Sequence, residues 1–327
     1  MHSFSDCSLP PPRRHIALTL GFPNKEALVF QTSGSISHHA HVTGTDCRPD
    51  IVAAFTPHWI QNATLWPCIR LAGEAPSKGK PPVHQKIQAI SYLHHLLLAR
   101  PDLHVAQGLL TTERHITFLL GIGGVGIRSF DVLWTNKEID RLINAFIYRL
   151  YDPGFFADSA YELIIPDLER KLVTYTLRIA VEGKGFIECP DFLPVYATSP
   201  FGTRTHVLSN PASGVKVGGK PLTVIKDQLC NRGTRFNEHL ILDAIHAKGT
   251  VPGVVEMVYK ATVDGPPFIA EFRQKYRTGL RQIGSPFMSI PTPQKVLEIV
   301  FDLLEGNLPL CCHFTCLQLL STAVFTY

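Results

Sequence analysis

Short apolar runs bounded by turn residues dominate this chain, and they limit the folds open to it more than any other feature. Runs of this length between Gly, Pro, Asp or Ser are typical of β-strands, whereas only a few stretches repeat apolar residues at helical spacing. The chain has 327 residues, enough for about two domains with cores of their own. We therefore expect a mixed fold, α+β or α/β, built from more than one domain.

The first domain is expected over residues 26–165, after a loose Pro-, Ser- and His-rich arm at 1–25. Its clearest signal is the recurrence of apolar residues from Ile87 to Leu97 at helical spacing, ahead of Pro101, which ends the run. Strand-like runs lie before and after this helix, so we expect a mixed α/β domain. The expected elements are helices at 83–100 and 136–151 and strands at 27–30, 51–55, 103–110, 115–122 and 125–134.

A second strand-rich region follows the segment 166–190, which we expect to be a linker. It extends over 191–306 and ends in a helix that Thr292 caps. The remaining residues, 307–327, contain no Asp, Glu, Lys or Arg, which sets them apart from the rest of the chain. The expected elements are strands at 192–197, 205–209 and 222–226, a helix at 234–248, strands at 254–263 and 278–283, and a helix at 292–305.

Charge, hydropathy and cysteine pattern argue against several classes of function. The formal net charge is +4 with no dense run of Lys or Arg, so neither nucleic-acid binding nor membrane-surface binding is indicated. The N-terminal residues lack the apolar core of a signal peptide, and no uncharged apolar run reaches the length of about 18 residues that a membrane helix needs. We expect an intracellular protein of the cytoplasm or nucleus. Its 8 cysteines form no CxxC pair, so we expect mostly buried thiols and neither a zinc site nor a disulfide scaffold.

A glycine cluster at Gly121, Gly123, Gly124 and Gly126 has the spacing of a dinucleotide-binding loop. Such a loop needs a strand before it and a helix after it, so that the phosphates meet a helix N-terminus. Here the next segment, 127–134, has strand character. The cluster therefore favours a hairpin turn over a phosphate site.

Two acids and a lysine in the first domain form a candidate metal site: Asp50, Glu74 and Lys78. A pair of carboxylates can hold Mg²⁺ while a lysine orients the attacking water, as in restriction-nuclease-like folds. Those nucleases place the second acid and the lysine close together on one strand, whereas Lys78 falls in a Pro- and Gly-rich loop. A structural relic or an unrelated fold is favoured, and a Mg²⁺-dependent nuclease stays open as the lesser alternative.

The strongest constellation is a lysine at the end of an apolar strand and a glutamate on the helix that follows. Lys226 ends such a strand, and Glu238 shares a helix face with Ile241 and Leu242. A carboxylate on an apolar helix face is costly unless it is paired, and a strand lysine would pair with it. In protein kinases such a lysine contacts the phosphates of ATP, and the glutamate pairs with it. On these two residues alone, a solvated Lys and Glu at the edges of their elements is the alternative.

The order of these elements, with several segments of the chain, resembles the fungal-type protein kinases, in which an N-terminal α/β region precedes a kinase fold. The family implies a kinase small lobe at about 190–290 and an adenine hinge near 284–288. It implies Lys226 as the phosphate-contacting lysine, Glu238 as its helix partner, and ATP and Mg²⁺ as ligands. The segments that carry the resemblance, within about residues 40–306, are 87–110, 146–156, the strand of Lys226, 251–255 and 292–305.

The chain departs from this family in two respects. In the loop between the first two strands of the lobe only Gly202 is available, where kinases use several glycines to close the backbone over phosphates. After Lys226 there is no HRD, DFG or APE motif, so no catalytic base and no Mg²⁺-holding aspartate is identified. We therefore expect weak or absent ATP binding and no phosphoryl transfer by this chain.

The uncharged tail at 307–327 stands where the catalytic loop of the family would follow. A read-through intron or a frameshift near Gly306 would produce such a tail, and a genuine alternative C-terminus is the other explanation. The interpretation is a kinase-like protein truncated before its catalytic loop. A pseudokinase or scaffold that binds an unidentified protein partner is the first alternative, and the nuclease is the second.

Overall fold

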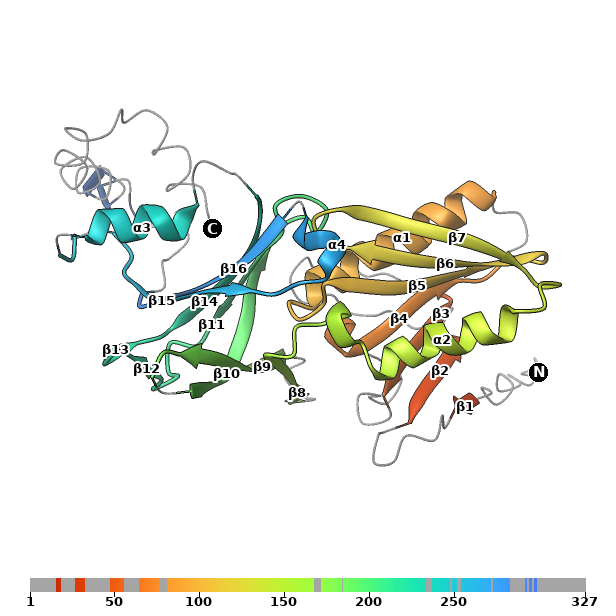
Figure 1. Cartoon of the computed structure of the whole chain (residues 1–327), viewed down its shortest axis with the longest axis horizontal. Helices are drawn as coiled ribbons and strands as arrows, with labels where there is room; N and C mark the ends of the chain where they lie inside the picture. The colour runs from red at the N-terminus through yellow and green to blue at the C-terminus, as the bar shows by residue number, and fades with distance from the viewer. Residues whose placement is uncertain are drawn as a thin grey trace, which may run out of the picture. The chain divides into compact units, whose positions relative to one another are not determined.

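The chain divides into two compact units, each with a sheet of its own (Figure 1). The mixed α+β class expected from the sequence is confirmed. The first unit comprises Met1–Arg100, Val105–Ile122 and Ile127–Gly154, and the second comprises Pro101–His104, Gly123–Gly126 and Phe155–Tyr327. The structure, a computed structural model, describes residues 16–18, 27–32, 48–55, 65–76, 81–167, 172–183, 185–232, 237–247, 249–251, 254–271, 273–282, 292, 294–295 and 297–298.

Among the described residues, the sheet of the first unit has seven strands, β1 to β7, and their order in the sheet is their order along the chain. Adjacent strands from β1 to β4 are antiparallel, as are β5 and β6, whereas β4 and β5 are parallel. A parallel pair needs a crossover connection, and α1 (Pro82–Ala99) supplies it. The other bounds are β1 Ile16–Leu18, β2 Leu28–Thr32, β3 Ile51–Phe55, the 3-10 helix η2 Trp66–Cys68, β4 Ile69–Glu74, β5 Val105–Thr111, β6 His115–Ile122 and β7 Gly126–Leu133.

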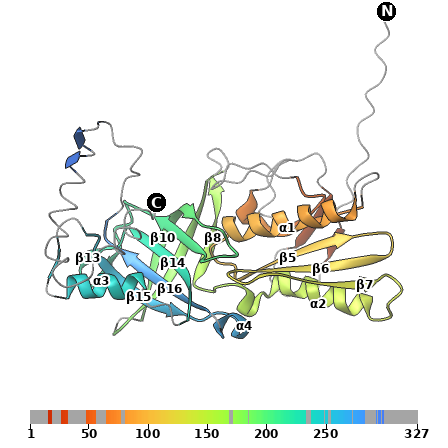
Figure 2. The same ribbon diagram turned by 90° about the horizontal axis from the view of Figure 1, so that it is seen from above.

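Helices α1 and α2 (Ile139–Tyr151) cover opposite faces of this sheet (Figure 2). Leu93 of α1 packs so close to β5 that a Cβ atom added at Gly108 would lie 2.8 Å from its Cδ2 atom. On the other face, the ring of Phe146 of α2 packs on that of Phe118 of β6, with ring centres 4.9 Å apart. The predicted apolar face of α2 is buried at Phe146, Ile147 and Leu150. That of α1 is buried at Leu93 and Leu97, whereas Ile87, which begins the predicted apolar run, is 59% exposed.

The sheet of the second unit has the strand order β15-β16-β14-β11-β10-β9-β8, and all neighbouring strands are antiparallel. Helix α3 (Glu238–His246) lies between β14 and β15 along the chain and packs Leu242 against Val224 and Leu280. The other bounds are the 3-10 helix η3 Gly154–Phe156, β8 Tyr161–Asp167, β9 Leu172–Val181, β10 Gly185–Ala197, β11 Thr205–Ser209, the hairpin β12 Lys216–Val217 and β13 Lys220–Pro221, β14 Val224–Asn231, β15 Met257–Val263, α4 Pro267–Ala270 and β16 Arg273–Leu280.

The segment 166–190 is not the linker that we expected, because β9 and the start of β10 lie in it. Along β9, Val173, Tyr175, Leu177 and Ile179 are each 0 or 1% exposed. Threonines and an arginine stand between them, so the strand buries one face only and shows no continuous apolar run. This alternation was the available signal, and it identifies a half-buried strand.

The other elements agree in part. Strand β1 lies in the arm expected at 1–25, β4 was not expected, and β14 continues past Lys226 to Asn231, so this lysine does not end its strand. The helices predicted at 83–100 and 136–151 are α1 and α2, and the glycine cluster forms the turn between β6 and β7. Among the described residues, no helix has both the length and the apolar character needed to cross a membrane. The cysteines in the described part of the chain, Cys68, Cys189 and Cys230, are buried free thiols.

Several predicted features lie outside the described residues: Lys78, the hinge at 284–288, Gly306 and the tail at 307–327. Of the helix predicted at 292–305, the structure describes its beginning only. There the Lys295 backbone N–H donates to Thr292 Oγ1 at 3.2 Å, as expected of a capping threonine.

Candidate functional site

Lys226 of β14 forms an ion pair with Glu238 of α3, as the sequence predicts. The Lys226 side chain is 6% exposed and the Glu238 side chain is 34% exposed, so the cation is almost fully buried and the anion is partly open to water. A buried ammonium group is tolerated only with a partner of opposite charge. The two residues are therefore a specific pair between strand and helix, and not two solvated side chains.

Strand register and side-chain alternation explain why Lys226 faces α3. Lys226 lies opposite Val207 of β11 and Thr278 of β16, in the interior of the sheet. Its neighbour Asp227 points to the other face, because successive side chains of a strand alternate. Glu238 is the first residue of α3, where the helix dipole favours a negative charge. The N-terminal end of the helix thus presents the carboxylate to the strand lysine.

Three further contacts hold α3 in place. The backbone N–H of Val251 donates to Nδ1 of His246 at 3.2 Å, and Nε2 of the same ring donates to Val255 O at 2.9 Å. The imidazole ring therefore ties the loop that follows α3 back to the helix. On the solvent side, Lys260 of β15 forms an ion pair with Asp243 of α3.

Gly202, the glycine predicted to lie over the phosphates, is in the loop 198–204 between β10 and β11. Its φ angle lies outside the left-handed region, and a Cβ atom there would meet nothing closer than Ser199 O at 3.9 Å. Neither the backbone conformation nor the space around it requires a glycine. Any phosphate-binding role of this loop has to rest on the direction of its backbone amides.

A cluster of buried charges, which the sequence analysis did not identify, lies on the other face of β14. Arg277 donates to both carboxylate oxygens of Asp227 at 2.7 Å, and the Tyr161 hydroxyl donates to the same group at 2.7 Å. Asp158 accepts from Lys275 at 2.9 Å and from Arg277 at 2.7 Å. The two negative and two positive charges of this cluster balance. Their ion pairs join Asp158, which precedes β8, to strands β14 and β16.

The charges of this cluster reinforce one another. Burial by itself raises the pKa of Asp158 and of Asp227, but the Lys275 and Arg277 cations outweigh it and hold both pKa values far below the usual range. The cluster therefore remains ionised at neutral pH. Its arrangement is that of a structural network, because each carboxylate is already bonded to both cations.

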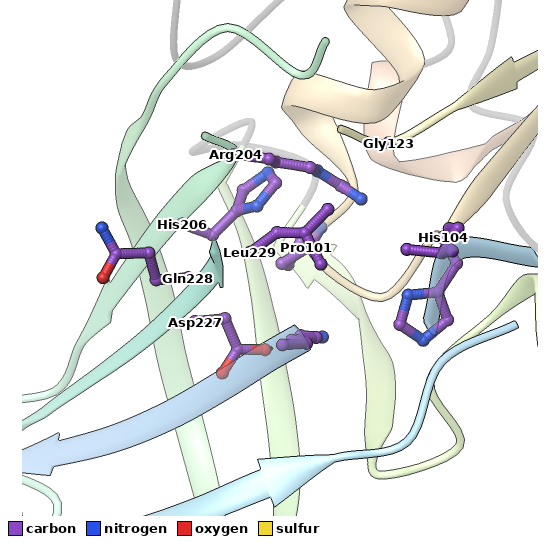
Figure 3. A pocket seen from close by; sticks show the side chains of 10 residues that line it. Pro101, His104, Gly123, Arg204, His206, Asp227, Gln228 and Leu229 are labelled. Atoms are coloured by element: carbon purple, nitrogen blue, oxygen red, sulfur yellow. Dashed lines mark ion pairs between the residues drawn. The ribbon is translucent and has the colours of Figure 1, made fainter. Parts of the chain in front are cut away.

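A small cavity lies beside the charged cluster (Figure 3). Burial, followed by the Lys275 cation, lowers the pKa of His104 at this cavity to about 3, so its imidazole is neutral at physiological pH. Neither Lys226 nor Glu238 belongs to the lining, so the cavity is separate from the predicted nucleotide site. The lining residues are Pro101, His104, Gly123, Arg204, His206, Asp227, Gln228, Leu229, Ile269 and Lys275.

In the first unit, the structure brings Asp50 and Glu74 together at one end of the antiparallel strands β3 and β4. Asp50 directly precedes β3, Glu74 ends β4, and Oδ2 of Asp50 accepts a hydrogen bond from Ala75 N at 3.2 Å. Glu74 is 1% exposed, and the Tyr92 hydroxyl donates to its carboxylate. Two members of the candidate metal site thus lie at the same end of neighbouring strands. Among the described residues, however, no group of three or more His, Cys, Asp or Glu is arranged to hold a metal ion.

Comparison with known proteins gives no relative. No protein-family model, no curated protein and no solved structure matches the chain. The geometry of the Lys226–Glu238 pair and of the Asp50–Glu74 pair is therefore the basis on which a function can be assigned.

Proposed function

We propose that the second unit is a nucleotide-binding lobe of the protein-kinase type, in which Lys226 contacts the phosphates of ATP. The observation that carries the proposal is the Lys226–Glu238 ion pair between a central strand and the helix that follows it. The order of elements supports it too. Counting from β10 and leaving aside the β12–β13 hairpin and the four-residue helix α4, three strands, a helix and two strands follow one another, with the lysine on the third strand as in kinases.

The two residues of the pair have distinct roles in this proposal. The Lys226 ammonium group has three N–H donors, and within the described part of the chain the acceptor that it contacts is the Glu238 carboxylate. The other donors can bind phosphate oxygens. Because the Lys226 side chain is 6% exposed, water screens its charge little, and a phosphate is attracted more strongly than at the surface. Glu238 keeps the lysine side chain in the direction of the ligand.

The proposal is limited to nucleotide binding. Phosphoryl transfer needs a base that accepts the hydroxyl proton and carboxylates that hold Mg²⁺. The residues after Lys226 in this sequence contain no HRD or DFG motif that would supply them. The function proposed for this lobe is therefore the binding of ATP.

Calorimetric titration with ATP in the presence of Mg²⁺ tests this function. We expect Lys226→Met to weaken ATP binding by about tenfold or more, because a desolvated charge-assisted contact to phosphate is lost. Lys260→Met is the matched control. Lys260 also pairs with a carboxylate of α3, but its side chain is 54% exposed, so we expect its removal to change the ATP affinity by less than about twofold.

Two results would contradict the proposed function. One is the absence of ATP binding by the wild-type protein at millimolar concentrations. The other is equal ATP affinity of the wild-type and Lys226→Met proteins, with circular dichroism showing that both are folded.

The placement of Asp50 and Glu74 at the same end of β3 and β4 favours a second candidate function, Mg²⁺-dependent phosphodiester hydrolysis by the first unit. The test is incubation of plasmid DNA with the wild-type, Asp50→Asn and Asp131→Asn proteins. Asp131 accepts a hydrogen bond from Thr117 on the same sheet and serves as the control. Cleavage that requires Mg²⁺ and is lost only in Asp50→Asn supports a nuclease. Cleavage that persists in Asp50→Asn, or no cleavage by the wild-type protein, excludes it.

A further inference from the structure

The loop 198–204 is held closed by one of its own side chains. The Thr198 hydroxyl donates to Thr203 O at 2.9 Å and accepts from the Thr205 backbone N–H at 2.8 Å. These bonds join the two ends of the loop, but they do not fix the peptide groups at its tip. In the proposed function this is the loop that meets the phosphates, so the direction of those peptide groups matters.

Two groups from distant parts of the sequence bind the tip of this loop from outside. The backbone N–H of Gly124 donates to Pro200 O at 2.6 Å. The guanidinium of Arg273, on β16, donates to Gly202 O at 2.5 Å. Gly124, Arg273 and the loop all belong to the second unit.

The glycine turn fits against the loop because it has no side chains. A Cβ atom on Gly124, whose φ is +75°, would lie 2.9 Å from Arg273 Cδ and would collide with Leu229. A Cβ atom on Gly123 would lie 2.9 Å from Nη1 of Arg204. Contacts this short are essentially never made by real Cβ atoms, so a side chain at either position would force Arg204, Leu229 or Arg273 to shift. The glycine cluster thus has a role that neither a dinucleotide loop nor a plain hairpin explains.

The positions of the two bound carbonyls set the direction of the neighbouring amides. In a planar trans peptide the N–H points opposite to the C=O of the same peptide group. Since Pro200 O and Gly202 O point to the glycine turn and to Arg273, the N–H groups of Phe201 and Thr203 point the other way. Each of these two amides at the loop tip therefore points away from the group that binds the neighbouring carbonyl.

That orientation is toward the side of the sheet on which Lys226 lies. Arg273, Lys275 and Arg277 alternate along β16 and share one face. Lys275 and Arg277 bind Asp227, which is on the face opposite to Lys226. Arg273 therefore reaches the loop from the face away from Lys226, and the amides are turned toward the lysine.

We propose that Arg273 and the Gly123–Gly124 turn form a brace that fixes the loop 198–204 with its amides directed at the phosphates of the nucleotide. Arg273 is a positioning residue, and the brace takes the place of the several glycines that a kinase loop normally carries. This inference rests on the proposed nucleotide-binding function. According to this inference, the backbone amides of the loop recognise the phosphates of the nucleotide and not its base. Arg273 and the glycine turn hold these amides in position by binding the loop carbonyls.

The test compares Arg273→Met, Arg273→Lys and the control Arg178→Met. Arg178 forms an exposed pair with Glu188 on the same sheet. Calorimetry measures the affinity for ATP and for adenosine, and hydrogen exchange measures the protection of the amides at 198–204. We expect Arg273→Met to weaken ATP binding about tenfold without changing adenosine binding, and to speed exchange in this loop. Arg273→Lys keeps a donor and should recover part of both effects, while Arg178→Met should change neither.

Three results would overturn the brace. They are unchanged exchange at 198–204 in Arg273→Met, unchanged ATP affinity in that variant, or equal losses of ATP and adenosine binding. Failure of the proposed function is distinguishable, because it is the absence of ATP binding by the wild-type protein. In that case faster loop exchange in Arg273→Met would still show that Arg273 holds the loop, but its role toward a nucleotide would be refuted.

Discussion

Asp227 is the residue of the buried charged cluster whose change should cost the most stability. Its carboxylate accepts from Arg277, Lys275 and Tyr161. Asp227→Asn leaves two buried cations with a single counter-charge, so we expect the free energy of unfolding to fall by about 3–5 kcal/mol. Urea denaturation of the whole chain, monitored by circular dichroism, measures the change.

An exposed ion pair on the same sheet is the control for this substitution. The side chains of Arg178 and Glu188 are 57% and 62% exposed, so Glu188→Gln should lower the free energy of unfolding by less than about 1 kcal/mol. If Asp227→Asn cost no more than Glu188→Gln, the buried cluster would not be the structural network described above.

His104 should make the stability of the second unit depend on pH. Burial and then Lys275 lower its pKa in the folded protein to about 3, whereas an unfolded histidine has a pKa of about 6.5. Between these values the unfolded chain binds a proton that the folded chain does not, so stability falls as the pH falls from about 6.5 toward 3. Asp158 and Asp227, with lowered pKa values, add to this loss only below about pH 4.

Replacement of His104 isolates its contribution. His104→Gln should reduce the proton uptake on unfolding by about one proton between roughly pH 4 and 6. The slope of the free energy of unfolding against pH, measured by urea denaturation, reports this number. An identical slope in the variant and the wild type would show that His104 is not kept neutral by the fold.

Some ion pairs of the structure could be predicted from the sequence and others could not. The Lys226–Glu238 pair could be predicted, because a carboxylate on an apolar helix face demands a cation and the preceding strand offers one. The Asp227–Arg277 pair could not, because the partners are 50 positions apart and only the register of β14 with β16 places them opposite each other. A charged residue in a half-buried strand gives the same sequence pattern whether it faces water or a buried partner.

Substitution of two glycines by alanine tests how closely the elements pack. A Cβ atom at Gly108 of β5 would lie 2.8 Å from Leu93 of α1 and 3.0 Å from the backbone oxygen of Ala72, so Gly108→Ala should lower the free energy of unfolding by about 1–3 kcal/mol. Gly202→Ala should change it by less than about 0.5 kcal/mol, because its surroundings are open. Urea denaturation compares the two variants. Equal effects would mean that α1 does not pack on β5 as described.

At the level of elements, helices were easier to predict than strand partners. The apolar faces of α1 and α2 appear as helical periodicity within one segment, and both were located from it. β9 was missed because its buried residues alternate with threonines and an arginine. The order of strands in a sheet depends on contacts between distant segments, which no local pattern encodes.

At the level of the whole molecule, the mixed class could be predicted, but the assignment of short segments to each unit could not. Pro101–His104 and Gly123–Gly126 belong to the second unit although the residues around them belong to the first. These two segments belong to the second unit because of tertiary contacts such as the hydrogen bond from the Gly124 N–H to Pro200 O. The hydrogen bond from the glycine turn to the loop 198–204 is therefore a feature that no local sequence pattern encodes.

Contact between Lys226 and the phosphates of ATP is the central claim, and affinity labelling tests it most directly. In an acyl phosphate of ATP, a lysine amine near the phosphates attacks the acyl carbon, forms an amide, loses its proton to water and releases ATP. We predict that mass spectrometry finds the acyl group on Lys226 and that excess ATP suppresses this labelling. Labelling of exposed lysines such as Lys260 with none on Lys226 would contradict the claim.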